Sequence, residues 1–367
     1  MVPHRLPRST PRVLALALLL VASVGARPAA GAEAAPGVAY VSNQNGDVSV
    51  IDLATMQVSG SISAYGKEPR GIGLTADGKL LVLANREGGA IAVIDRATGK
   101  LLRHVPVGKN PEFVRVRGRL AFVSYEPSST GQAPAKAPPA ASGAGREPGK
   151  DDDKDEPAHI AIVDLDHGKV LRSIRGGLET EGIEFAADGR HIIVTNEADN
   201  NITVHEIATG KLVKTIDVKP WGNRPRGIKR APDGKSYVAT LEFSDAFIVL
   251  DPDYRVIRSV KTGGSPYGVS FDRSGARLYV AAAKTKELQV FDTKTWEPVK
   301  SVTTGTRCWH FTFTPDDRKI LLACGRSSEI VVVDADTLQV DKRLPDDQLP
   351  WGIITWPKAF GSLDQPD

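Results

Sequence analysis

A short apolar segment that ends in an acidic residue recurs seven times along the chain. The segments are rich in β-branched residues, a pattern typical of β-strands. Successive acids are 43, 69, 42, 45, 41 and 42 residues apart, so one unit is about 42 residues long and a single spacing contains an insertion. The segments are VSVID ending at Asp52, IAVID at Asp95, IAIVD at Asp164, ITVHE at Glu206, FIVLD at Asp251, LQVFD at Asp292 and IVVVD at Asp334.

Each unit repeats the same order of strands and turns. Residues 227–240 show the first half, which is a strand led by glycine, a Pro-Asp-Gly-Lys turn and the strand SYVAT. The acid-ended strand follows, and then a turn of the Ala-Thr-Gly-Lys type and a strand of the KLVKTI type. The glycines in these turns supply the positive φ needed between antiparallel strands. The pattern predicts an all-β fold, a seven-bladed β-propeller of four-stranded antiparallel blades, because the rival parallel β-helix has shorter repeats.

The two ends of the repeat region complement each other. The first unit begins at its second strand, at residues 38–42, and the sequence ends with a lone first strand at residues 352–356. We therefore expect the C-terminal strand to pair with the N-terminal strands, which closes the ring and leaves no free sheet edge at the seam. A short tail, residues 357–367, follows this strand.

Residues 1–32 have the pattern of a secretory signal peptide. Arg5, Arg8 and Arg12 form a basic start, and residues 13–22 form an apolar run that is too short to span a bilayer. Small residues at 24–26 and 30–32 offer two cleavage sites. We expect export by the Sec route to the periplasm or the medium, and a mature protein of residues 33–367 that forms one propeller without a membrane span.

Composition and charge agree with this organisation. The chain has 367 residues with 35 glycines and 25 prolines, and 41% of its residues are hydrophobic, which excludes a disordered chain, a coiled coil and a disulfide-dense mini-protein. The formal charge of the whole chain is +3, but residues 1–32 hold four arginines and no acid, so the mature charge is −1. The mature protein therefore offers little electrostatic attraction for nucleic acid.

An insertion interrupts the third unit between Glu126 and Ala158. It is rich in Pro, Ala, Ser and Gly, and it ends in the acidic run DDDKDE at residues 151–156. Without apolar periodicity, the insertion at 126–158 is predicted to be a disordered loop. It leaves the face on which we expect a ligand, so it is either a lid, an acidic tether for a cationic partner or a solvated loop without a role, and base rates favour the last.

The residue before the leading glycine of each first strand is predicted to lie at the mouth of the central channel. These seven positions hold two arginines, two adjacent acids and three adjacent aromatic residues, whereas a purely structural repeat could keep one residue type at all of them. Such a set suits a small, partly anionic or aromatic ligand, although structural salt bridges at a wet rim are the alternative. The residues are Arg70, Glu112, Glu181, Arg226, Tyr267, Trp309 and Trp351.

A second ring is expected about 16 residues later, where the second strand of each blade returns to the same face. Arg226 and Glu242 are predicted to pair across neighbouring strands. Glu181 and Glu197 are predicted to be close like charges, which raises the pKa of one of them or calls for a cation. The second ring comprises Gln44, Arg86, Glu126, Glu197, Leu241–Glu242, Ala283 and Gly325.

Motifs for metal, haem or nucleophilic chemistry are absent from the sequence. His310 follows Trp309 on an inner strand and could face the channel, but a lone histidine is more often a hydrogen-bonded wall residue. The other histidines form neither an HxH nor an HExxH pattern, so we expect no metal site, and no CxxCH haem motif or GxSxG nucleophile motif occurs.

The two cysteines are predicted to face each other. Cys308 begins an inner strand and Cys324 ends the next, and the turn at residues 315–318 places them nearly opposite in register. In an oxidising compartment such a pair can form a disulfide, so we predict a cross-strand bridge beside Trp309; two buried thiols are the alternative.

The repeat resembles a known family. YVSN at residues 40–43, IVTN at residues 193–196 and the Pro-x-Gly strand starts are similar to the YVTN-repeat β-propellers (YncE-like) over nearly the whole mature chain. The segments PWGIITWPKAFG and RCWHFTFTPD resemble a subgroup associated with PQQ-dependent alcohol oxidation. The resemblance implies a propeller, and an association with PQQ as cofactor; it is poorly specific for function because many activities share this fold.

Three functions follow, in order of preference. The first is a binding or scaffold protein, an accessory to quinoprotein oxidation, with a small-molecule site at the mouth and a periplasmic protein partner on the same face. The second is a lactonase-type hydrolase in which Arg226, Glu242, Arg70 and His310 polarise a lactone and activate water. The third is single-stranded DNA binding, which the aromatic residues favour and the mature charge disfavours. We expect a monomer.

Overall fold

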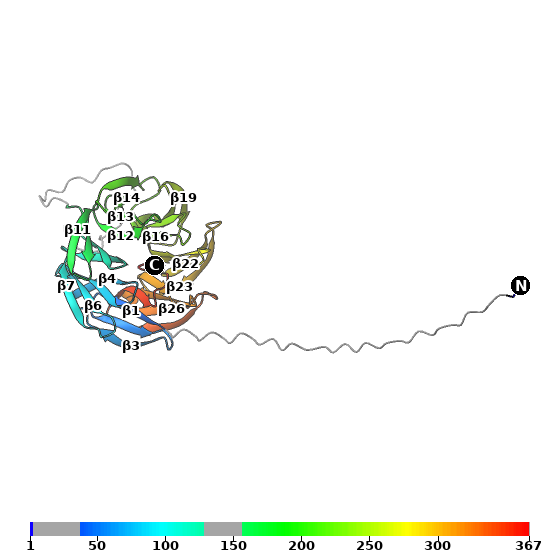
Figure 1. Ribbon diagram of the computed structural model, residues 1–367, viewed down its shortest axis with the longest axis horizontal. Coiled ribbons are helices and arrows are strands. Elements are labelled where there is room, and N and C mark those ends of the chain that lie inside the picture. Colours follow the sequence, from blue (N-terminus) through cyan, green and yellow to red (C-terminus); the bar gives the residue numbers. More distant parts are fainter. Residues whose placement is uncertain (3–36, 128–155, 367) are drawn as a thin grey trace. The chain divides into compact units, whose positions relative to one another are not determined.

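The computed structural model describes residues 1–2, 37–127 and 156–366, and the predicted seven-bladed β-propeller is confirmed. Seven antiparallel sheets of four strands are arranged in a ring (Figure 1). The other regular elements in these ranges are two short 3₁₀ turns, η1 (Glu242–Ser244) and η2 (Gly325–Ser327). Apart from residues 1–2, the predicted leader at 1–32 lies outside the described residues, as does most of the predicted insertion at 126–158.

Each blade is named here from its innermost strand outwards. Blade 1 consists of β28 (Pro350–Trp356), β1 (Val38–Asn43), β2 (Val48–Asp52) and β3 (Gln57–Ile62), and blade 2 of β4 (Lys67–Leu74), β5 (Leu80–Glu87), β6 (Ala90–Asp95) and β7 (Leu101–Pro106). Blade 3 consists of β8 (Pro111–Arg117), β9 (Leu120–Tyr125), β10 (His159–Asp164) and β11 (Lys169–Arg175), and blade 4 of β12 (Thr180–Phe185), β13 (His191–Asn196), β14 (Asn201–Glu206) and β15 (Leu212–Asp217).

The remaining blades have the same plan. Blade 5 consists of β16 (Pro225–Arg230), β17 (Tyr237–Leu241), β18 (Ala246–Leu250) and β19 (Val256–Lys261), and blade 6 of β20 (Pro266–Phe271), β21 (Arg277–Ala282), β22 (Glu287–Asp292) and β23 (Pro298–Thr303). Blade 7 consists of β24 (Cys308–Phe313), β25 (Lys319–Cys324), β26 (Glu329–Asp334) and β27 (Val340–Pro345).

The ring closes as the two chain ends predict. Strand β28 pairs antiparallel with β1, with Ala39 opposite Thr355, so blade 1 combines strands from both ends of the repeat region. The apolar face of this blade packs against blade 7, where Val41 belongs to one buried cluster with Leu321 and Ala323. The seam is therefore held both by backbone hydrogen bonds and by apolar burial.

The acid that ends each repeat segment has a local structural role. The Oδ1 atom of Asp52 accepts hydrogen bonds from the backbone N–H groups of Ala54 and Thr55, at 2.9 and 2.8 Å. Asp95 makes the same bond to the N–H of Thr98 at 2.8 Å. The carboxylate thus satisfies the backbone of the turn that follows, which explains why a short polar acceptor recurs at this point of every unit.

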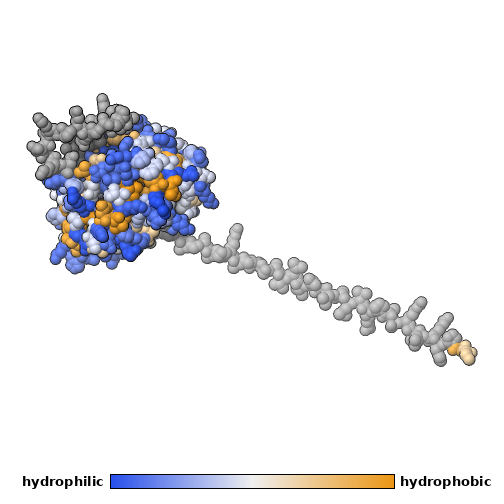
Figure 2. Space-filling view, turned by 90° about the horizontal axis from the view of Figure 1, so that it is seen from above, coloured by the Kyte–Doolittle hydropathy of each residue, from blue (hydrophilic) through white to orange (hydrophobic). Residues whose placement is uncertain are grey.

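Buried apolar layers lie between the blades, and the outer strands face solvent. The side of the ring in Figure 2 shows hydrophobic patches among hydrophilic surface. Exposed apolar side chains on outer strands include Leu171, Val213 and Ile257.

Close contact between inner strands depends on glycine after the mouth position. A Cβ at Gly71 would lie 2.5 Å from the carbonyl oxygen of Glu112 in the next blade, and a Cβ at Gly227 would lie 2.4 Å from that of Tyr267. At these two positions only glycine fits such an approach. Two blades carry a ring at this position instead, Phe113 and His310, and the centroids of these two rings are 6.3 Å apart inside the channel.

The tail after β28 is built into the ring, a feature that the sequence did not predict. The N–H of Phe313 donates to the carbonyl of Phe360 at 2.8 Å, and that of Ser362 to the carbonyl of Phe311 at 2.9 Å, so the tail runs along β24. The C-terminus accordingly lies near the centre of the ring (Figure 1).

Beyond Ser362 the tail is held by charged side chains from other blades. Arg115 Nη1 donates to the carbonyl of Leu363 at 2.6 Å, and Lys229 Nζ to that of Asp364 at 2.9 Å. Both cations are buried beside Glu184, whose pKa they lower despite its burial. Since Arg115 and Lys229 lie three residues beyond the mouth positions of their strands, the tail fills the channel below the mouth.

Candidate functional site

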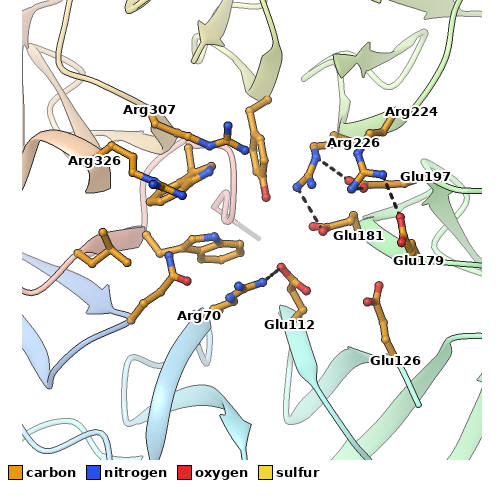
Figure 3. Close-up of a pocket in the computed structure, with 15 residues that line it drawn as sticks. Arg70, Glu112, Glu126, Glu179, Glu181, Glu197, Arg224, Arg226, Arg307 and Arg326 are labelled. Carbon is orange, nitrogen blue, oxygen red and sulfur yellow. Dashed lines mark hydrogen bonds and ion pairs between the residues drawn. The ribbon is translucent and has the colours of Figure 1, made fainter. Parts of the chain in front are cut away.

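The mouth of the channel forms one polar pocket of about 340 Å³, a size that suits a small molecule. The sequence-predicted residues that it brings together are Arg70, Glu112, Glu181, Glu197, Arg226, Tyr267, Trp309 and Trp351, along with Gln44 and Glu126 from the second ring. The other lining residues are Glu179, Arg224, Arg307, Arg326 and Leu349. Figure 3 shows these side chains converging on a common space.

A backbone repeat accounts for four pocket residues that the sequence reasoning missed, namely Glu179, Arg224, Arg307 and Leu349. The residue two positions before each mouth residue has a positive φ in all seven blades, between 48° and 63°. This left-handed conformation is uncommon for residues other than glycine, and it turns the chain into the inner strand. The seven residues are Glu68, Asn110, Glu179, Arg224, Ser265, Arg307 and Leu349. Aligning the repeats two residues upstream would have revealed them.

Two buried arginines of blade 5 gather four glutamates. Arg226 Nε lies 2.6 Å from carboxylate oxygens of both Glu197 and Glu242, and its Nη1 lies 3.2 Å from Glu181 Oε1. Arg224 pairs with Glu179 at 2.9 Å, with Glu242 at 3.1 Å and also with Glu197. The predicted pairing of Arg226 with Glu242 is present, although Glu242 lies behind the pocket wall and does not line the pocket.

Burial gives these carboxyl groups different proton affinities. It raises the pKa of Glu181 to about 7, because the loss of water outweighs the attraction of Arg226. Burial and the neighbouring Glu181 also raise the pKa of Glu197 well above its ordinary value. Burial acts against Glu242 too, but Arg226 and Arg224 hold its pKa below the ordinary range. The cluster can therefore carry a proton near neutral pH.

Blade 2 contributes a separate pair. Arg70 Nη1 is bonded to Glu112, its neighbour in the ring of mouth residues. Arg86 was predicted to line the site, but its guanidinium pairs with Glu68 Oε2 at 2.8 Å and it is not part of the pocket lining.

Three aromatic side chains, from blades 6, 7 and 1, form another part of the pocket wall. The guanidinium of Arg226 lies 4.2 Å from the ring centre of Tyr267, a cation–π contact. Trp309 lies directly against Gly325, since a Cβ there would be 2.0 Å from its indole ring. Trp351 contacts His310 with ring centres 4.4 Å apart. All three side chains are largely buried, with 2–7% of their surface exposed, and they give the pocket wall an aromatic portion.

His310 lies beneath the pocket rather than in it. Its ring is enclosed by Tyr267, Trp351 and Phe113, and its Nδ1 is 3.1 Å from Ser362 Oγ in the tail. Burial lowers the pKa of His310 to about 3, so the ring is neutral at physiological pH. His310, a predicted site residue, therefore does not line the pocket. It lies one layer below, where it contacts a tail whose position the sequence did not indicate.

The predicted disulfide is confirmed. Cys308 and Cys324 lie directly opposite each other on β24 and β25 and are joined by a disulfide bond. It ties together the ends of two strands at the edge of the pocket, where Arg307 precedes one cysteine and Arg326 lies two residues beyond the other.

Within residues 37–127 and 156–366, no cluster of three or more His, Cys, Asp or Glu side chains could hold a metal ion. The described part of the chain also contains no helix long and apolar enough to cross a membrane.

No protein-family model and no curated protein matches the sequence. Many solved structures share the fold. A candidate 6-phosphogluconolactonase from Bacteroides uniformis has a TM-score of 0.68 and 16% identity, covering 88% of this chain and 99% of that one. The hydrazine synthase of Kuenenia stuttgartiensis has a TM-score of 0.67 and 18% identity, covering 81% and 92%. The dihydro-heme d1 dehydrogenase NirN has a TM-score of 0.61 and 17% identity, covering 91% and 78%. These similarities show the fold alone.

Proposed function

We propose that this protein is a binding protein whose channel mouth takes up a small organic molecule that contains a ring and an acidic group. The observation that carries the proposal is the segregation of the pocket wall. Trp309 and Trp351 line the pocket with 7% and 2% of their surface exposed. Arg307 and Arg326 lie on one side of the pocket, while the glutamates gather on the other (Figure 3). Oriented cations, acceptors and stacking faces in one concave pocket are typical of a ligand site.

We also propose that the protein acts outside the cytoplasm. The basic and apolar pattern of residues 1–32 supports export, and the Cys308–Cys324 disulfide is of a kind that persists in oxidising compartments. We propose further that the protein is a YVTN-repeat propeller, a proposal supported by segments such as residues 40–43 and 193–196.

The association with PQQ-dependent oxidation extends this proposal. PQQ is a flat ring system that bears three carboxylates. The chemistry of the pocket fits one end of such a molecule, because Trp309 could stack on the rings and Arg307 and Arg326 could bind carboxylates. PQQ held there would supply two-electron redox chemistry, whereas the protein residues would bind and orient it. A scaffold role beside a quinoprotein remains part of the same proposal.

Lactone hydrolysis is the second candidate. Arg226 and Arg70 line the pocket and could polarise a carbonyl, but the proposed water-activating residue, His310, lies below the mouth against Ser362. Arg226 is also engaged by three glutamates. A hydrolase would therefore have to activate water with one of the pocket glutamates, of which Glu181, with its pKa near 7, is the best placed.

A ligand screen on the mature protein, residues 33–367, tests the proposal. Ring-bearing organic acids, PQQ among them, are screened by thermal shift and confirmed by calorimetry, and aldonolactones are assayed for turnover. We expect binding without turnover, and at least about tenfold weaker binding for Trp309→Leu. Trp221→Leu, at an exposed tryptophan outside the pocket lining, is the matched control. Turnover of a lactone that is lost in Glu181→Gln would favour the hydrolase instead.

A further inference from the structure

The five arginines that line the pocket differ in how far carboxylates neutralise them. Arg70, Arg224 and Arg226 each pair with at least one buried glutamate at hydrogen-bonding distance. Among carboxylates, Arg307 has only a distant partner, with its Nη2 3.8 Å from Glu242 Oε1, and its guanidinium also lies 5.9 Å from the ring centre of Trp309. Arg326 makes no ion pair with any carboxylate of the described residues. Positive charge therefore remains on one side of the mouth, on blade 7.

The two incompletely paired arginines are neighbours. The backbone N–H of Arg326 donates to the carbonyl of Thr306, the residue before Arg307, at 3.1 Å. In the close-up of the pocket, both side chains come from the same side, next to the aromatic rings (Figure 3). The Nε atom of Arg307 is buried and has no hydrogen-bond partner among the residues that the structure describes. A buried guanidinium N–H without an acceptor is costly, so an acceptor from a ligand would stabilise it.

The disulfide fixes the backbone that carries this pair. Cys308 follows Arg307 directly, and Cys324 stands two residues before Arg326, so the bond joins the two strand ends from which the arginines project. Ser327 Oγ reinforces the link by accepting the N–H of Thr306 at 2.9 Å. Within the same unit, the indole of Trp309 lies against the backbone of Gly325. One covalent bond thus links the strand ends that carry the two arginines and Trp309.

We propose that Arg307 and Arg326 form an anion subsite for a carboxylate or phosphate group of a ring-bearing ligand, and that the Cys308–Cys324 disulfide positions this subsite. The ring of the ligand would lie on Trp309, and its remaining polar groups would face the glutamate side of the pocket. The inference rests on the proposed binding function, and it adds the orientation of the ligand and the part that the disulfide plays. A planar guanidinium pair suits the oxygens of a carboxylate or phosphate and discriminates against neutral ligands of the same shape.

Matched pairs of probes test the subsite in the mature protein. D-Glucuronate and D-glucose share one ring and differ in a carboxylate, as do benzoate and benzyl alcohol; glucose 6-phosphate adds the phosphate form. Affinities are measured by calorimetry or ligand-detected NMR at fixed ionic strength. We expect at least one acidic probe to bind about tenfold or more tightly than its neutral partner. Arg307→Gln and Arg326→Gln should each remove most of that difference, whereas Arg255→Gln, an exposed arginine of an outer turn, should not.

The disulfide is tested separately with the double variant Cys308→Ser/Cys324→Ser. If its far-ultraviolet spectrum and cooperative unfolding show that it folds, we expect weaker binding of the acidic probe and unchanged binding of the neutral one. Reduction of the wild-type bond with a phosphine, in which the phosphine gives up two electrons and becomes its oxide while water supplies the oxygen and the two protons of the thiols, should have the same effect. Unchanged acid binding in the folded variant or in the reduced protein would overturn the positioning role.

The results separate the inference from the proposed function. Equal binding of acidic and neutral probes, unaffected by Arg307→Gln and Arg326→Gln but weakened by Trp309→Leu, would overturn the anion subsite and leave the binding function intact. Binding of no probe would also overturn the subsite as stated, and the broader screen would then decide the binding function independently.

Discussion

His310 makes a sharp prediction about stability, because it is an ionisable ring enclosed in the channel. Its fractional exposure is 3%, and burial lowers its pKa to about 3 from an ordinary value of 6.5. Below pH 6.5 the unfolded chain therefore takes up a proton that the folded protein excludes. At neutral pH this difference in proton uptake has almost no effect on the free energy of unfolding. As the pH falls toward 3, it lowers the free energy of unfolding progressively.

The magnitude follows from these two pKa values. Between pH 7 and pH 5 the group should lower the free energy of unfolding by about 2 kcal/mol, since each pH unit within the window is worth about 1.4 kcal/mol. The substitution that removes this effect is His310→Phe, because Phe113 fills the corresponding position of blade 3. Urea unfolding at pH 5, 6 and 7, followed by tryptophan fluorescence, gives the free energy for each protein.

The informative quantity is the difference in pH dependence between wild type and variant. Other groups titrate in this range, among them Glu181, whose raised pKa makes the folded protein more stable at lower pH, but they are common to both proteins. His104→Phe, at an exposed position of β7, is the matched control and should behave like the wild type. Parallel curves for wild type and His310→Phe would refute the reasoning.

Three further predictions concern buried charge and close packing. Arg115→Met should lower the free energy of unfolding in urea by about 3–5 kcal/mol, because it leaves Glu184 buried with only the more distant Lys229 as a partner. Arg255→Met, at an exposed ion pair, should have little effect, and equal effects of the two variants would contradict the stabilising role of the buried Arg115–Glu184 pair. Arg226→Met should lower the free energy of unfolding by a similar amount, because three buried glutamates lose their shared partner. Adding Glu197→Gln should restore part of this stability, and a double variant less stable than Arg226→Met would contradict the view that Arg226 neutralises these glutamates. Gly325→Ala should displace the indole of Trp309, lower the free energy of unfolding by about 1–3 kcal/mol and change the tryptophan fluorescence spectrum. Gly60→Ala, where a Cβ meets nothing within 4 Å, should have none of these effects. An unchanged spectrum for Gly325→Ala would show that the indole does not lie against Gly325.

The fold could be predicted because its determinants are local and repeated. Asp52 and its counterparts satisfy the turn two or three residues away, and glycines such as Gly227 permit the close approach of the next blade. The ring of mouth residues could be predicted from the same repeat. A fixed strand register places the equivalent residue of each blade, such as Arg70 or Trp351, at the same height in the channel. The cysteine pair followed from one hairpin turn.

The parts of the site that could not be predicted depend on distant contacts. Arg326 reaches the pocket from a 3₁₀ turn, which the strand pattern does not indicate. The tail has no apolar period, and Ser362 and Asp364 are placed by contacts with blades far away in sequence. For the same reason the sequence could not show that His310, a candidate site residue on an inner strand, is enclosed below the mouth by the tail and the aromatic rings.

The five tryptophans allow a direct, site-resolved test of whether the channel mouth binds a ring-bearing acid. In protein labelled with ¹⁵N-tryptophan, each indole N–H gives its own NMR signal, assigned by single substitutions. Trp309 and Trp351 line the pocket, whereas Trp221, Trp296 and Trp356 do not. On titration with an acidic probe that binds in calorimetry, the signals of Trp309 and Trp351 should shift and saturate together while the other three stay in place. Saturating shifts confined to the other three, or binding with no shift at Trp309 and Trp351, would contradict a site at the mouth.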